Sequence, residues 1–183
     1  MAPSLIGPRP KPLLRGSHVG AQVSPAGARE SSGYVRNVEI GAAEYRLAAE
    51  EHLSAAFKCH IGGDYLTCHY LCGLAVECIL RAYRWKIDRS WSGRHVLPRL
   101  YAESKFDSLV KVPQEAEMAA NLYVITSRWA NHHRFTSPGK LLQHLNSVDA
   151  TVGVKGDKLK RNSFEMYDAA VFIVRAGINK WKN

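Results

Sequence analysis

Apolar residues recur at every third or fourth position along most of the chain after residue 38, which is the spacing of one face of an α-helix. Residues 42–60 are rich in Ala, Leu and Glu, which are strong helix formers. Gly62 and Gly63 then interrupt the pattern, and Asp64 is well placed to cap a second helix that runs to about residue 86. Because the connection is so short, we expect these two helices to lie antiparallel.

Further helices are predicted in the second half of the chain. A short one is expected over residues 95–105, and Pro113 suits the first turn of a longer one. Ser137 and Pro138 are typical of the start of the next helix. Residues 152–161 are rich in Gly and Lys, so we interpret them as a loop.

The last helix has the most regular pattern. Asn162 and Glu165, three positions apart, resemble a capping box at its start. Apolar residues then follow at steps of three and four: Phe164, Tyr167, Val171, Val174, Ile178 and Trp181. No convincing strand pattern is found. The pattern therefore predicts an all-α protein, an up-down bundle of four to five antiparallel helices.

The first 36 residues differ from the rest. They show no periodicity and contain five of the eight prolines and five of the fourteen glycines, so residues 1–36 are predicted to be a disordered basic tail. Residues 37–183 are predicted to form a single helical domain. Helices with two apolar sides favour pairing of a bundle with its own copy, so we expect a homodimer.

The composition narrows the class of protein. The chain has 183 residues, 46% of them hydrophobic and 22% charged, which is typical of a globular domain. No apolar run approaches the ~18 residues that a membrane span needs, so no membrane partner is expected. The net charge of +9 favours a polyanionic partner such as nucleic acid. The four cysteines fit no disulfide framework, and no secretory segment is found, so a cytoplasmic location is expected.

The segment 127–135, SRWANHHRF, carries the richest candidate chemistry. Cationic, imidazole and aromatic side chains at a helix end suit RNA, and the candidate binding residues are Trp129, Asn131, His132 and Arg134. Arg128 could hold a phosphate and His133 could move protons, which is much of what metal-free RNA cleavage requires. On a continuous helix these two side chains would point about 140° apart, so the helix must end or bend between them. The alternative is a polar helix end with Trp129 and Phe135 in the core.

Three other features could carry chemistry. Glu77 lies in the apolar run LCGLAVECIL and either faces outward or pairs with an Arg or His of another helix. Several Cys and His residues lie close together in the sequence, but without zinc-site spacing, so no metal and no cofactor are predicted: Cys59, His60, Cys68, His69 and Cys72. A run of basic residues forms either a phosphate contact or a solvated surface: Lys155, Lys158, Lys160 and Arg161.

The order of features over residues 45–100 resembles the HEPN family, helical-bundle proteins of toxin–antitoxin, phage-defence and RNA-processing systems. An Ala- and Leu-rich helix precedes Gly62-Gly63-Asp64-Tyr65, and the next helix contains HYLCGLAVE, ending at Glu77, and then LRA. The segment HVLPRL, residues 95–100, is similar to the His-x-Leu segment that follows in many members. The resemblance implies an all-α bundle that is usually dimeric.

The resemblance also implies site residues. The nuclease motif of the family is an Arg followed, after four to six residues, by a His, and Arg128 and His133 match it with four residues between them. Arg128 would stabilise the phosphate, His133 would act as the acid or base, and Glu77 would be the supporting carboxylate. Whether His132 or His133 is the active histidine stays open.

Two functions follow from the resemblance. One is a metal-independent endoribonuclease of toxin or defence type, silenced by an antitoxin partner. The other is a non-catalytic module that binds RNA, a nucleotide or a partner protein such as a nucleotidyltransferase. The second is favoured by Trp129, where active members often have a polar residue, and by Arg134-Phe135, which resembles the Arg-Tyr-like pair of members without nuclease chemistry.

Overall fold

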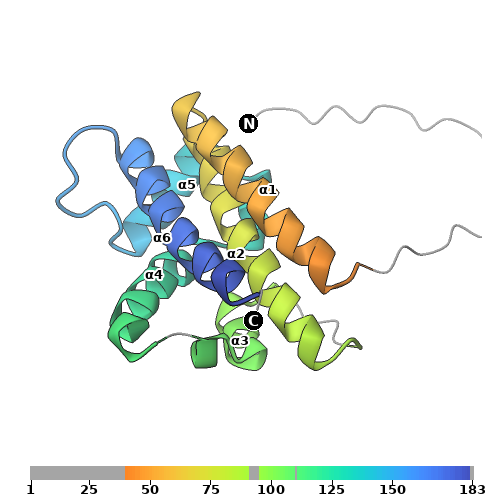
Figure 1. Ribbon diagram of the computed structural model, residues 1–183. Helices are drawn as coiled ribbons and strands as arrows, with labels where there is room; N and C mark the ends of the chain where they lie inside the picture. Colours follow the sequence, from red (N-terminus) through yellow and green to blue (C-terminus); the bar gives the residue numbers. More distant parts are fainter. Residues whose placement is uncertain (1–39, 91–94, 110, 182–183) are drawn as a thin grey trace, which may run out of the picture. The chain divides into compact units, whose positions relative to one another are not determined.

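The first two helices form the antiparallel hairpin that the sequence predicts (Figure 1). The computed structural model describes residues 40–90, 95–109 and 111–181. Helix α1 (Ala42–Ile61) ends at Gly62, and Gly63 adopts a left-handed conformation with φ of 81°, which favours glycine. The carboxylate of Asp64 then accepts the backbone N–H of Thr67 and caps α2 (Tyr65–Ile87). The turn therefore forms for the local reasons that the sequence indicates.

The rest of the described chain is also helical, and it contains no strand, so the all-α prediction is confirmed for these residues. Residues 40–90, 95–109 and 111–181 contain six α-helices, one more than the upper end of the expected range. The helices after α2 are α3 (Leu97–Ser104), η1 (Phe106–Leu109), η2 (Val112–Gln114), α4 (Glu115–Arg128), η3 (Asn131–Phe135), α5 (Pro138–Ser147) and α6 (Lys158–Trp181), where η denotes a 3₁₀ helix. The prediction for residues 1–36 lies outside the described residues.

Helix α2 is the centre of the core. It packs against α1, α3 and α6, and α4 packs against α6 on the other side (Figure 1). Gly73 of α2 contacts the indole of Trp129, and a Cβ atom at residue 73 would lie 2.1 Å from the ring. The indole N–H donates to the backbone oxygen of Tyr70 at 3.0 Å. This contact fixes the residue that follows α4 against the middle of the core.

The start of α6 differs from the prediction. The helix begins at Lys158, and the side chain of Asp157 accepts the backbone N–H of Lys160 as a helix cap does. The predicted capping box at Asn162 is therefore wrong, and residues 158–161 are helical. Lys, Leu and Arg are good helix formers, so four mostly polar residues continue the helix despite their resemblance to a loop. As a result Asn162 lies one turn inside α6 and is buried.

Within residues 40–90, 95–109 and 111–181, none of the helices is both long enough and apolar enough to cross a bilayer.

Candidate functional site

The helix that carries Arg128 ends at that residue. Trp129 is extended, with φ of −102° and ψ of 140°, because its indole packs against Gly73. The 3₁₀ helix η3 follows and carries His133. The break between Arg128 and His133 that the motif requires is therefore present. The Arg128 side chain reaches α6, and the His133 side chain reaches α2.

A continuous chain of hydrogen bonds joins Arg128 to His133. The Arg128 guanidinium donates to Glu165 at 2.6 Å and to the side-chain oxygen of Asn162 at 3.3 Å. The amide nitrogen of Asn162 lies 2.9 Å from Nδ1 of His69. Nε2 of His69 lies 3.2 Å from Nδ1 of His133. Arg128 and His133 thus belong to one polar network, although two other side chains stand between them.

The donors at one end of this network set the tautomers at the other. A guanidinium only donates, so the oxygen of Asn162 faces Arg128 and its NH₂ group faces His69. Nδ1 of His69 is therefore an acceptor, and its Nε2–H donates to His133. Nδ1 of His133 also receives the backbone N–H of Ala130 at 3.3 Å. Neutral His133 consequently carries its proton on Nε2.

Nε2 of His133, the ring nitrogen that faces away from His69, is buried and has no hydrogen-bond partner among the described residues. Nε2 of His144 on α5 is in the same condition, and the two imidazole rings are 4.9 Å apart between centroids. The ring of His132 lies 4.8 Å from that of His133. Four histidines therefore surround the point where η3 meets α2 and α5.

Burial keeps the inner histidines neutral. It lowers the pKa of His69 to about 3, and the neighbouring His133 adds to the effect. Burial likewise lowers the pKa of His133 to about 4, together with the nearby His144 and His132. Burial acts to raise the pKa of Glu165, but hydrogen bonds from Arg128 and Arg161 hold it below its ordinary value. At neutral pH the network is therefore two neutral imidazoles beside a charged Arg–carboxylate cluster.

The network reaches the protein surface at this cluster. Glu165 accepts a second hydrogen bond, at 2.6 Å, from the exposed Arg161, and the Arg128 side chain is 15% exposed. A shallow hollow of about 380 Å³ adjoins it, lined by Val152, Gly153, Val154, Lys155, Arg161 and Glu165. From Arg128 to Arg161 the sequence has seven Lys or Arg residues and two Asp residues, so this stretch carries more than half of the net charge of +9.

Glu77 lies outside this network. It is 1% exposed, and its carboxylate accepts hydrogen bonds from Arg81 at 2.6 Å and from Nδ1 of His95 at 2.7 Å. Eight residues of α2 separate Glu77 from His69, which is about 12 Å along the helix axis. One of the two sequence interpretations pairs Glu77 with an Arg or His of another helix. The carboxylate does pair with an Arg and a His, but Arg81 is on α2 with Glu77, and His95 lies before α3.

The four predicted binding residues divide into two groups. Trp129 is 6% exposed, with its ring against Gly73 and Tyr70, so the indole is part of the core. Asn131 is half-buried, whereas His132 and Arg134 are exposed on η3. The Arg134 guanidinium lies 4.6 Å from the centre of the Phe135 ring, and Phe135 is 80% exposed. The exposed edge of η3 is therefore cationic and aromatic, and Phe135 is not a core residue.

The Cys and His residues considered as metal ligands have separate partners. Sγ of Cys68 lies 3.9 Å from Sγ of Cys72, His60 contacts Ser163, and His69 belongs to the network above. Within the part of the chain that the structure describes, no group of three or more His, Cys, Asp or Glu side chains is arranged to hold a metal ion.

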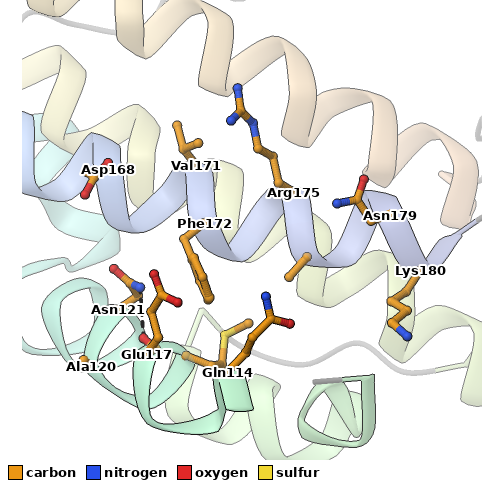
Figure 2. Close-up of a pocket in the computed structure, with 12 residues that line it drawn as sticks. Gln114, Glu117, Ala120, Asn121, Asp168, Val171, Phe172, Arg175, Asn179 and Lys180 are labelled. Carbon is orange, nitrogen blue, oxygen red and sulfur yellow. Dashed lines mark hydrogen bonds between the residues drawn. The ribbon is translucent and has the colours of Figure 1, made fainter. Parts of the chain in front are cut away.

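A separate cavity of about 600 Å³ lies between α4 and α6 (Figure 2). Figure 2 shows Phe172 of α6 pointing toward Glu117 and Asn121 of α4 and Gln114 at the end of η2. Its lining contains none of the candidate catalytic or binding residues, so the candidate site is not in this cavity.

Three comparisons were made, with protein-family models, with curated proteins and with solved structures, and none of them gives a match.

Proposed function

We propose that this chain binds RNA through the surface around Arg128, Lys155 and Arg161, in the manner that the HEPN resemblance implies. The observation that carries the proposal is the concentration of positive charge between residues 128 and 161, around the cluster in which Glu165 holds two guanidinium groups. Lys and Arg side chains in such a surface neutralise phosphates and release counterions, which supplies much of the affinity for a nucleic acid. A guanidinium held in place by a carboxylate loses little freedom when it binds a phosphate.

The geometry of His133 favours binding over cleavage. A general base for RNA cleavage must offer a lone pair to the 2′-hydroxyl. In His133 the lone pair is on Nδ1, which already faces the Ala130 N–H and the His69 ring. His133 is also 2% exposed. In this arrangement the side chain can donate a hydrogen bond from Nε2 but has no nitrogen free to take a proton, which supports the non-catalytic alternative.

Metal-independent cleavage is a second candidate. It is favoured by the network that joins Arg128 to His133, because these are the residues that the resemblance assigns to the phosphate and to proton transfer. Cleavage requires a rearrangement that exposes His133. In this candidate function, binding of a second copy of the chain produces the rearrangement. The test is incubation of RNA in EDTA with the wild type and with Arg128→Ala/His133→Ala, where cleavage by the wild type alone favours the enzyme.

Binding is tested with a labelled RNA and anisotropy measurements over a range of salt concentrations. The double variant Lys155→Ala/Lys160→Ala removes two exposed charges of the proposed surface, and Arg99→Ala/Lys111→Ala removes two exposed charges elsewhere. The first should weaken binding and reduce the slope of log affinity against log salt by about 1.4, at ~0.7 for each phosphate contact of a single strand. The control should keep the wild-type slope. Equal binding by both variants and the wild type contradicts the proposed surface.

A further inference from the structure

A small cleft lies where the end of α1 meets the start of α6. Its volume is about 300 Å³, and it is lined by His60, Lys155, Asp157, Lys160, Arg161 and Phe164. The lining thus combines two aromatic rings with three cations and one carboxylate. It shares Lys155 and Arg161 with the hollow beside Glu165, but its aromatic rings belong to neither the core nor the Arg128 network.

The two rings offer faces to a flat ligand. Phe164 is 50% exposed, although it belongs to the apolar pattern of α6. The ring of His60 lies 6.1 Å from that of Phe164 and 5.7 Å from that of Tyr65. Neighbouring aromatic faces that remain in contact with solvent are what a nucleobase stacks on in proteins that bind single strands.

The hydrogen bonds of His60 give its ring a defined acceptor. The hydroxyl of Ser163 donates to the backbone oxygen of Lys160 at 2.9 Å, so its oxygen is left to accept from Nδ1–H of His60 at 2.8 Å. Neutral His60 therefore has its lone pair on Nε2. A ring that lines the cleft thus presents an acceptor, which suits an amino group of a base or a ribose hydroxyl.

The charges of the cleft favour a phosphate. Lys155, Lys160 and Arg161 supply three positive charges against the single carboxylate of Asp157 in this lining. One oxygen of Asp157 already accepts the backbone N–H of Lys160 at the start of α6. The cations are therefore in excess in a cleft whose other members are aromatic.

We propose that this cleft binds one unpaired nucleotide, with its base on Phe164 and His60 and its phosphate on the three cations. The inference rests on the proposed RNA binding and deepens it, because it specifies single-stranded RNA: bases in a duplex are stacked on one another and cannot enter. A volume of about 300 Å³ is large enough for a single base. The carboxylate of Asp157 among the cations disfavours the continuous anionic surface of a membrane.

The test compares Phe164→Leu with Tyr123→Leu. The first variant removes the ring and keeps an apolar side chain, and the second makes the same change at an aromatic residue of α4 that is 70% exposed and outside the cleft. The probes are a 12-nucleotide single-stranded RNA, a duplex RNA of the same length, adenosine monophosphate, and vesicles containing phosphatidylserine. Circular dichroism and the melting temperature show whether each variant is folded.

Phe164→Leu should weaken single-strand binding about fivefold or more and leave duplex binding unchanged, and Tyr123→Leu should alter neither. Saturable binding of adenosine monophosphate by the wild type, lost in Phe164→Leu, would show that the cleft takes free nucleotides as well as strands. If the wild type binds adenosine monophosphate in this way but binds no RNA, the nucleotide site stands and the proposed function fails. If Phe164→Leu binds the single strand as the wild type does, the cleft is rejected and RNA binding stands. The inference is rejected if Phe164→Leu weakens only the binding of vesicles. It is also rejected if the wild type binds none of the probes.

Discussion

Acidification should destabilise this protein well above the pH at which its carboxylates titrate. His69 and His133 are buried and neutral, with pKa values lowered to about 3 and about 4. In the unfolded chain both return to about 6.5. The unfolded state therefore binds more protons than the folded state below pH 6.5, so the stability is greatest above that pH and is lost as the pH falls.

The size of the effect follows from these values. Between pH 7 and pH 5 each histidine becomes almost fully protonated in the unfolded chain and stays almost fully neutral in the folded one. The free energy of unfolding should therefore fall by about 2 kcal/mol for each histidine, or about 4 kcal/mol for both. Glu165 adds little in this range, because even in the unfolded chain a glutamate has a pKa of about 4.3 and is mostly ionised at pH 5. A loss of this size is a large part of the ~5–15 kcal/mol of a typical domain.

Urea unfolding followed by circular dichroism at pH 7, 6 and 5 measures this directly. The variants His69→Gln and His133→Gln should each remove about half of the pH dependence, whatever they do to the stability at pH 7. His132→Gln, at an exposed position of η3, is the control: His132 is a minor cause of the lowered pKa of His133, so this variant should keep most of the dependence. If the wild type has the same free energy of unfolding at pH 7 and pH 5, or if both buried variants keep its full dependence, the neutral histidine network is refuted.

Two further predictions concern the packing around the site. Gly73→Ala should lower the free energy of unfolding by about 1–3 kcal/mol, because the new methyl group meets the Trp129 ring; thermal melting checks this, and an unchanged melting temperature contradicts the contact. Glu77→Gln should lower the free energy of unfolding by urea by about 3 kcal/mol, because it leaves Arg81 beside a neutral amide at a buried position. The control is Glu50→Gln, which removes the more exposed ion pair with Arg46 and should cost less than about 1 kcal/mol. Equal losses in the two glutamine variants would show that Glu77 is not a buried partner.

The helices could be predicted because their signals are local. The Gly-Gly-Asp turn before α2 and the Ser-Pro start of α5 each lie within a few residues of the helix end that they determine. The predicted cap of α6, Asn162, lies five residues after the true cap, Asp157, because residues 158–161 are mostly polar, as in a loop. The presence of a helix can thus be predicted from the periodicity of its apolar residues, whereas the start of α6 depends on the single side chain of Asp157.

Only part of the candidate site could be predicted from the sequence. The spacing of Arg128 and His133 showed that they could meet only if the helix ended between them, and α4 does end there. The residues that connect them could not be found in this way, because Asn162 and His69 are 93 positions apart and each lies on an otherwise ordinary helix face. In the sequence His69 is one of several closely spaced Cys and His residues, and Asn162 is interpreted as a helix cap. Neither pattern indicates that the two side chains form a hydrogen bond with each other.

The most direct test of RNA binding at this surface is ultraviolet cross-linking of the intact chain to a single-stranded RNA, followed by mass spectrometry of the linked peptides. The account predicts that the cross-linked residues fall between Arg128 and Glu165, and that Lys155→Ala/Lys160→Ala reduces their yield while Arg99→Ala/Lys111→Ala does not. Cross-links confined to other helices, or none at concentrations where a known RNA-binding protein gives them, would contradict it.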